Sequence, residues 1–134
     1  MDQRVSRKNL VDGTERRRSA HLFGLKAESA AALLLLVKGY SILARRYLVS
    51  GGEIDLIARR GEVVAFVEVK ARPDLEAAAF AISATKRRRI ARAARVWLSR
   101  NPWAAGFTFR GDAVYVAPRR LPRHERCAYT LDLD

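Results

Sequence analysis

The stretch that decides the fold is EIDLIARRGEVVAFVEVK, residues 53–70. Two runs rich in β-branched residues flank Gly61-Glu62, and a glycine in first place suits a two-residue type II′ turn. Arg60 then pairs with Val63, so the stretch predicts an antiparallel hairpin. A four-residue loop would keep the same sorting of side chains between faces, whereas a three-residue loop with a bulge would break it.

This register gathers charged side chains at one end of one face. Opposed residues point to the same face, with Cβ atoms about 5 Å apart. Asp55 therefore faces Glu68, and Glu53 faces Lys70. One face is entirely apolar and is expected to pack on the core, while the other is apolar only near the turn. The apolar face holds Ile54, Leu56, Ala58, Val63, Ala65, Val67 and Val69, and the other adds Ile57, Val64 and Phe66 to the charged residues.

Two facing carboxylates repel each other unless a positive charge lies between them. A divalent cation supplies that charge, because Mg²⁺ prefers oxygen ligands and often uses one or two carboxylates with waters and phosphate oxygens. Lys70 follows Glu68 on the same face, about 6.5–7 Å along the strand, within reach of such a water or phosphate. These groups suit phosphodiester hydrolysis. A solvent-facing strand end with cross-strand ion pairs accounts for them equally well.

The composition indicates one domain with a strongly basic surface. The chain has 134 residues and a net charge of +12, which attracts nucleic acid or an anionic membrane surface. Solubility alone would also account for the charge. Residues 1–20 are polar and contain six basic and three acidic residues, so they are expected to form a flexible basic tail before a single domain, residues 21–134.

Cysteine content and hydropathy favour a cytoplasmic protein. Cys127 is the only cysteine, which excludes an intrachain disulfide and suits a reducing compartment. The basic start is not followed by the apolar run of a secretory signal. The longest apolar run, AALLLLV at residues 31–37, is far shorter than the roughly 20 residues of a membrane-spanning helix. No membrane association is therefore expected.

Hydrophobic patterns predict helix, three strands, helix and one or two further strands, which is a mixed α/β domain. Pro102 ends the second helix because proline cannot continue one. The predicted elements are a helix over His21–Lys38, a strand over Tyr40–Val49, the hairpin, a helix over Ile82–Arg100, a strand within GDAVYVAP, and AYTLDLD as a candidate fifth strand.

Both helices carry a charged residue on an apolar face. Glu28 shares a helical face with Ala31 and Leu35, where a carboxylate needs a partner unless it sits on an exposed shoulder. Lys86 lies one turn before Ile90 on an apolar stripe that continues through Ala93, Ala94 and Trp97. It is expected to project toward the charged sheet end or a substrate phosphate, or else to extend its amine into solvent.

Arginines provide candidate contacts with nucleic acid. Arg88, Arg92 and Arg95 share the opposite face of the second helix, where such a row can contact successive phosphates. Charge rows are more often solvated faces, but the total charge favours binding here. Arg45, Arg46 and Arg72 flank the proposed site and are further candidates.

These motifs resemble a known nuclease superfamily. Asp55 in GEIDLIA, followed by Glu68 and Lys70 in FVEVK, resembles the PD-(D/E)xK pattern. Together with AE at residues 27–28, GYSIL, FVEVKAR and the helix that begins with KRRR, the chain resembles the YraN family from about Gly24 to Val116. That family is similar in its core to archaeal Holliday-junction resolvases.

The resemblance implies a restriction-endonuclease-like fold with an αβββαβ core, in which helices flank a mixed central sheet. It implies Asp55, Glu68 and Glu28 as ligands of Mg²⁺ or Mn²⁺, and Lys70 as the catalytic lysine beside these three acidic catalytic residues. DNA, branched or single-stranded, is the implied partner, and a homodimer would suit a junction substrate although no sequence feature establishes one.

Three positions depart from the family patterns. Ile54 replaces a proline that does no chemistry, Arg46 stands where asparagine is usual, and Gly111 stands where an aromatic residue is usual. The functional expectation is a metal-dependent, endonuclease-like protein that hydrolyses DNA. The main alternative is a weakly active or inactive nucleic-acid-binding module of repair, recombination or uptake on the same fold. A third is a protein–protein adaptor whose charge serves solubility.

Overall fold

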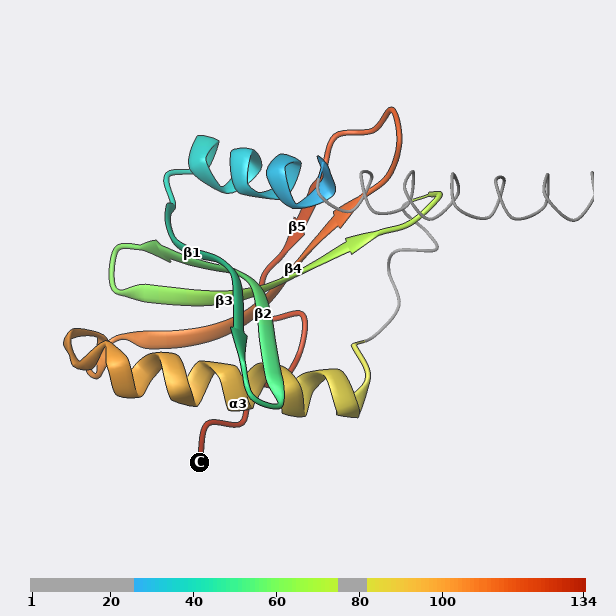
Figure 1. Cartoon of the computed structure of the whole chain (residues 1–134). Helices are drawn as coiled ribbons and strands as arrows, with labels where there is room; N and C mark the ends of the chain where they lie inside the picture. The colour runs from blue at the N-terminus through green and yellow to red at the C-terminus, as the bar shows by residue number, and fades with distance from the viewer. Residues whose placement is uncertain (1–25, 75–81) are drawn as a thin grey trace, which may run out of the picture.

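A five-stranded sheet forms the centre of the molecule in the computed structural model, which describes residues 26–74 and 82–134 (Figure 1). The strands follow one another in sequence order; β3 and β4 are parallel, and all other neighbours are antiparallel. The parallel pair is joined through α3, as parallel neighbours require. The elements are β1 (Ser41–Val49), β2 (Gly52–Arg60), β3 (Val63–Ala71), α3 (Ala84–Arg100), the short 3₁₀ helix η1 (Pro102–Ala104), β4 (Thr108–Val116) and β5 (Arg123–Glu125).

Two helices sandwich this sheet. A helix over residues 26–37 covers one face and α3 covers the other, as Figure 1 shows. Alanine and leucine side chains of the first helix pack on Leu56, Ala58 and Val67. The predicted apolar stripe of α3 is buried against Ile57 and Phe66 on the opposite face. The predicted mixed sheet between helices is therefore confirmed.

The hairpin has the predicted register. Arg60 pairs with Val63 across the turn, and the ladder runs to Leu56 opposite Val67. The sorting of apolar side chains also holds for the ladder, with one correction. Ile54 was expected on the face of Leu56, but it packs in the cluster beneath α3. Strict alternation therefore does not extend through the charged end of β2.

That charged end lies directly against α3. A Cβ atom at Gly52 would lie 2.5 Å from the carbonyl oxygen of Arg89 and 2.9 Å from the backbone nitrogen of Ala93, so only glycine permits this approach. The helix begins where Ser83 Oγ accepts a hydrogen bond from the backbone N–H of Lys86 at 3.1 Å. The first turns of α3 are thereby placed beside the carboxylates of β2.

The C-terminal part differs from the prediction. The fifth strand is Arg123–Glu125, paired with β4, and AYTLDLD forms no strand. Tyr129 instead fills the space beside Gly111, because a Cβ there would lie 2.7 Å from the tyrosine ring. Tyr129 also donates a hydrogen bond to the carbonyl of Phe66 at 2.7 Å. Gly111, where an aromatic residue is usual in the family pattern, thus makes room for an aromatic ring from elsewhere in the chain.

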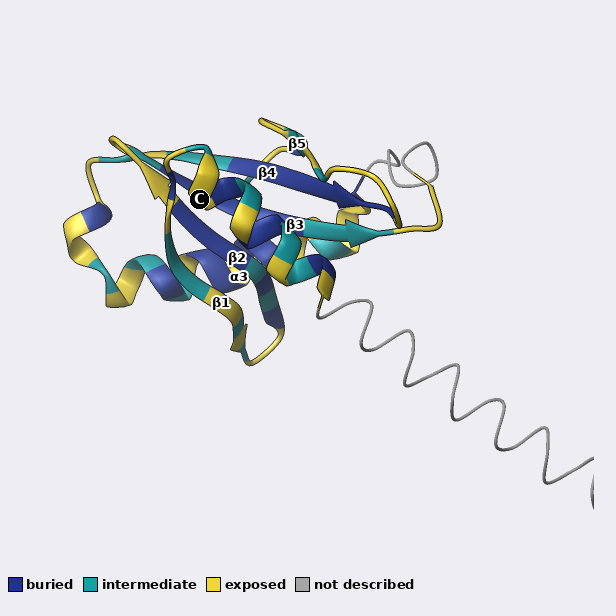
Figure 2. Ribbon diagram, turned by 90° about the horizontal axis from the view of Figure 1, so that it is seen from above, coloured by how far each residue is buried: buried dark blue, intermediate teal, exposed yellow. Residues whose placement is uncertain are grey.

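The central strands of the sheet are the most buried, and β1 and β5 form its more exposed edges (Figure 2). Within the described ranges, no helix is both long and apolar enough to cross a membrane. The predicted basic tail, the first residues of the His21–Lys38 helix and residues 75–81, between the hairpin and the second helix, lie outside the described residues.

Candidate active site

A pair of facing carboxyl groups forms the centre of the candidate site. Asp55 on β2 and Glu68 on β3 lie close enough to share a proton, and an oxygen of Asp55 accepts a hydrogen bond from the backbone N–H of Val69 at 2.8 Å. Glu68 is only 7% exposed. Burial first, and then the negative charge of Asp55, raise the pKa of Glu68 to about 8. The predicted convergence of Asp55 and Glu68 is therefore present in the structure.

One oxygen of this pair is a buried acceptor without a hydrogen bond in the described part of the chain. With both groups ionised, Oε2 of Glu68 is buried without a hydrogen-bond donor among the residues that the structure describes. A buried acceptor without a donor costs free energy. A proton on the pair, or a cation between the two groups, would relieve this cost.

Lys86 points into the charged cluster, the first of its two predicted orientations. Its Nζ lies 2.6 Å from Oε1 of Glu53 and 3.6 Å from Oε1 of Glu68. Burial lowers the pKa of Lys86, but the hydrogen bond to Glu53 and the charge of Glu68 outweigh burial and leave it raised. The hydrogen bond from Lys86 lowers the pKa of Glu53 in turn. The side chains of Glu53 and Lys86 therefore form an ion pair between β2 and α3.

Lys70 lies two residues beyond Glu68, as its position on β3 requires. Burial first, and then the positive charge of Arg72, lower the pKa of the Lys70 amine, while Glu68 opposes the shift. Arg72 is exposed and donates a hydrogen bond to the carbonyl of Ala71 at 2.8 Å. The amine of Lys70 therefore loses its proton more easily than an ordinary lysine does.

Glu28 has a different environment from the other acidic residues. Its two oxygens lie 3.4 Å from Nε of Arg45 and 3.8 Å from Nε of Arg46, and its side chain is 12% exposed. Arg45 also donates a hydrogen bond to Ser29 at 3.0 Å. These arginines neutralise the charge of Glu28, and its side chain is largely buried. The interpretation of Glu28 as an exposed residue on the shoulder of the helix is therefore wrong. Its role as a metal ligand stays a prediction.

Arg46 adopts a left-handed backbone conformation, with φ of 50°. Asparagine tolerates this conformation better than other residues with a side chain. The preference of the family pattern for asparagine here therefore has a backbone cause. The pairs Arg45–Leu56 and Tyr47–Ile54 leave Arg46 alongside Asp55, so the strained residue neighbours the candidate site.

The predicted arginine row of α3 is divided between two locations. Arg92 turns to the β1–β2 connection and donates a hydrogen bond to the carbonyl of Ser50 at 2.5 Å. Arg88 donates to the hydroxyl of Thr85 at 3.2 Å, and Arg95 donates to the carbonyl of Asp132 at 3.2 Å. Arg88 and Arg95 therefore point to one location, whereas the Arg92 side chain stabilises the turn between β1 and β2.

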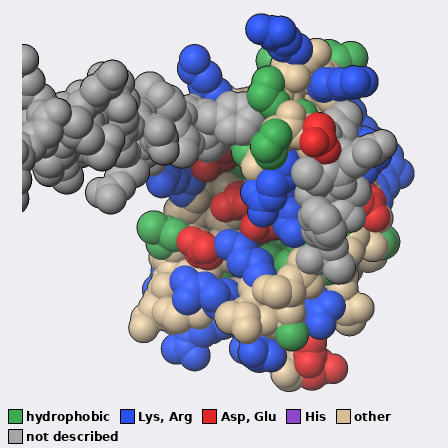
Figure 3. Space-filling model, turned by 90° about the vertical axis from the view of Figure 1, so that its right-hand side faces the viewer, with side chains coloured by type: hydrophobic (Ala, Val, Ile, Leu, Met, Phe, Trp, Pro, Cys, Tyr) green, Lys and Arg blue, Asp and Glu red, His purple; other side chains and the backbone are tan. Residues whose placement is uncertain are grey.

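Opposite charges are mixed on one face of the molecule. Figure 3 shows a face on which Asp and Glu side chains lie among Lys and Arg side chains. This arrangement agrees with the ion pairs of Glu28 and Glu53.

The donor set of the carboxylate pair fits Mg²⁺ or Mn²⁺. Both ions take carboxylate oxygens, and Mg²⁺ commonly binds one or two of them and completes its coordination with water and phosphate oxygens. Across residues 26–74 and 82–134, no group of three or more His, Cys, Asp and Glu side chains is arranged to hold a metal. The structure thus brings two carboxyl groups together, those of Asp55 and Glu68, and their role as metal ligands stays a prediction.

Sequence reasoning missed two features. The first is the Glu53–Lys86 ion pair at 2.6 Å, because the sequence directed Lys86 toward the charged sheet end but placed Lys70 opposite Glu53. The other feature is the buried Asp112, which contacts Arg110 and His124, each at 2.8 Å. An Asp directly before the apolar run AVYV was the available signal, because a buried charge needs partners.

Comparison with known proteins agrees with these motifs. The model of the family described as "Uncharacterised protein family UPF0102" matches residues 27–116, which include the whole candidate site. The UPF0102 protein of Methylobacterium nodulans is 62% identical over 117 residues, 87% of this chain and 91% of the relative. That of Methylorubrum extorquens is 60% identical over 122 residues, 91% of this chain and 95% of the relative. A relative from Bradyrhizobium diazoefficiens is 51% identical over 106 residues, 79% of this chain and 80% of the relative. The chain therefore belongs to the UPF0102 family, the YraN-like family that the GEIDLIA and FVEVKAR motifs predict.

Proposed function

We propose that this protein is a metal-dependent nuclease that hydrolyses phosphodiester bonds of DNA. The observation that carries the proposal is the buried carboxyl of Glu68 beside Asp55, with an oxygen that lacks a hydrogen-bond donor among the described residues. Two anions in this arrangement repel each other, and a divalent cation between them removes the repulsion. A core that needed only stability would place apolar residues at these positions.

The residues around the pair have distinct roles in the proposed reaction. A water oxygen attacks phosphorus and gives up a proton, the bond to the leaving oxygen breaks, and that oxygen takes up a proton. Asp55 and Glu68 hold Mg²⁺ or Mn²⁺, which when bound polarises the phosphate and lowers the pKa of water. Lys70 orients the attacking water or donates a hydrogen bond to a phosphate oxygen. Lys86 keeps the carboxylates of Glu53 and Glu68 from repelling the incoming phosphate.

The charge of the molecule supports a polyanionic substrate. The net charge is +12, and Arg45, Arg72 and Arg88 are exposed. Such a field concentrates nucleic acid near the surface and makes binding depend on salt. We include branched and single-stranded DNA in the proposal because of the resemblance to junction resolvases.

The test is cleavage of labelled single-stranded, duplex, flap and four-way-junction DNA in Mg²⁺ or Mn²⁺. Wild type is compared with Asp55→Asn and Lys70→Ala, and with Glu62→Gln as a charge-matched control at the exposed hairpin turn. Cleavage by wild type and Glu62→Gln alone would support the proposal and identify the preferred substrate shape. Equal cleavage by Asp55→Asn would refute it, since a contaminating nuclease would explain that result.

A second candidate function is nucleic-acid binding without hydrolysis. The observation that favours it is the position of the Lys86 ammonium, 3.6 Å from Oε1 of Glu68. This cation neutralises part of the charge of Glu68 without a metal. Thermal unfolding in Mn²⁺ separates the two candidates. A metal ligand pair predicts a rise in the unfolding temperature that Asp55→Asn abolishes, whereas a binding module predicts no metal-dependent rise in either protein.

A further inference from the structure

The start of α3 carries an unusual concentration of positive charge. Residues 86–89 are four consecutive basic residues, and the first turn contains no acidic residue. The N-terminus of a helix is the positive end of its dipole, so cations there lower stability. Lys86 has carboxylate partners, but Arg87, Arg88 and Arg89 are exposed. Departures of this kind from a local rule are expected at functional positions.

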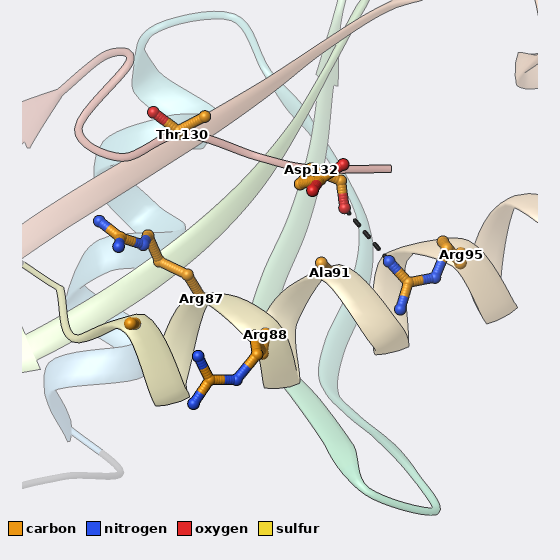
Figure 4. A pocket seen from close by; sticks show the side chains of 7 residues that line it. Arg87, Arg88, Ala91, Arg95, Thr130 and Asp132 are labelled. Carbon is orange, nitrogen blue, oxygen red and sulfur yellow. Dashed lines mark hydrogen bonds between the residues drawn. The ribbon is translucent and has the colours of Figure 1, made fainter. Parts of the chain in front are cut away.

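A cleft of about 420 Å³ lies between this helix and the C-terminal segment, residues 128–134 (Figure 4). Its walls are Arg87, Arg88 and Arg95 from α3 and Thr130 and Asp132 from the C-terminal segment, and two alanines of α3 complete the lining. Figure 4 shows Arg87 extending toward the side of Thr130 and Arg95 reaching Asp132. The cleft follows the shoulder of α3, away from the face that buries Ile90 and Trp97.

The arginines of the cleft keep most of their donors. Within residues 26–74 and 82–134, none of the three lies in an ion pair with a carboxylate. Arg88 bonds a hydroxyl and Arg95 bonds a backbone carbonyl. The carboxylate of Asp132 accepts a hydrogen bond from the backbone N–H of Asp134 at 3.2 Å. A guanidinium offers five N–H donors, so the cleft presents cationic donors with unused capacity.

We propose that this cleft binds the sugar–phosphate backbone of a nucleic acid strand, as a contact separate from the Asp55–Glu68 pair. The inference rests on the proposed function for the identity of the polyanion. Arg88 and Arg95 are seven residues apart, about 10 Å along the helix axis, so phosphates of two different nucleotides can each meet one of these arginines. The cleft therefore takes two phosphates of one strand, one near Arg87 and Arg88 and one near Arg95.

The first test measures binding of a labelled single strand and a labelled duplex by fluorescence anisotropy in EDTA over a series of salt concentrations. Arg87→Gln/Arg95→Gln is compared with Arg119→Gln/Arg120→Gln, an exposed pair with the same change in net charge. At about 0.15 M salt the cleft variant is expected to bind about 10- to 30-fold more weakly, with a salt slope shallower by about 1.4–1.8. The control variant should bind within about threefold of wild type. Equal effects of both variants would overturn the cleft as a site.

The second test uses the acidic wall. Asp132 lines the cleft, and Asp134, two residues away, does not. Asp132→Asn removes a negative charge that repels a phosphate, so it should tighten binding more than Asp134→Asn does. Identical affinities of these two variants would contradict a strand in the cleft. Competition with inorganic phosphate and with a free mononucleotide distinguishes a strand from a small anion. At equal phosphate concentration, either compound should displace the DNA poorly. Efficient displacement would overturn the proposal.

The outcomes separate this inference from the proposed function. Wild type that binds no nucleic acid would overturn both. Wild-type binding that the cleft variant retains, with an unchanged salt slope, would overturn the cleft alone. Loss of cleavage in Asp55→Asn is independent of the cleft, because binding is measured in EDTA, where the proposed hydrolysis does not proceed.

Discussion

The buried carboxyl of Glu68 should make the metal-free protein less stable as the pH rises. Burial, and then the facing Asp55 carboxylate, raise the pKa of Glu68 from 4.5 to about 8 in the folded protein. The unfolded chain therefore releases this proton at lower pH than the folded protein does. The stabilisation is complete below about pH 4.5 and is lost as the pH rises through about 8.

The size of the effect follows from the shift. Each pKa unit is worth about 1.4 kcal/mol, so a shift from 4.5 to about 8 gives a contribution of at most about 5 kcal/mol. This is a large part of the 5–15 kcal/mol that is typical for unfolding of a domain. Glu68→Gln removes the charge and keeps the shape, so it should remove most of this dependence on pH.

Urea denaturation in EDTA, at intervals from pH 5 to pH 9, measures the prediction. The free energy of unfolding of wild type should fall with pH relative to that of Glu68→Gln, so the two curves converge at low pH and separate at high pH. Glu62→Gln, at the exposed hairpin turn, should follow wild type. Parallel curves for wild type and Glu68→Gln would refute the assignment of a raised pKa to this group.

Three further predictions concern residues that hold the site together. Lys86→Met leaves Glu53 and its neighbouring carboxylates without their cation and should lower the free energy of unfolding by about 2 kcal/mol in urea titrations; an unchanged midpoint would show that the ion pair does not contribute. Gly52→Ala places a Cβ 2.5 Å from a backbone carbonyl of α3 and should cost about 3 kcal/mol, whereas Gly106→Ala, with nothing within 4 Å, should stay within about 0.5 kcal/mol; similar unfolding temperatures for both would contradict the close approach. Asp112→Asn removes a fully buried charge that answers an arginine and a histidine and should cost about 3 kcal/mol by calorimetry, and a neutral effect would contradict a structural role for that network.

The hairpin shows how much of the fold the sequence predicts. Side chains alternate with a period of two, so a turn at residues 61–62 and two apolar runs are enough to fix the pairs from Arg60–Val63 to Leu56–Val67. The same local patterns predict the stripe of α3 and its end before Pro102. The fifth strand was misplaced because AYTLDLD has a strand-like pattern, but Tyr129 is held by tertiary contacts beside Gly111.

By itself, the sequence predicted that Asp55 and Glu68 lie close together, because the turn at residues 61–62 fixes a hairpin that places both residues at its far end. Only the tertiary structure decided which cationic side chains form ion pairs with the acidic residues. Glu53 bonds Lys86 at 2.6 Å because Gly52 lets α3 approach β2, and Glu28 meets Arg45 because the first helix packs across the sheet. Such pairs join residues far apart in the chain, so their distances depend on how helices pack on the sheet, and no periodicity in the sequence encodes that packing.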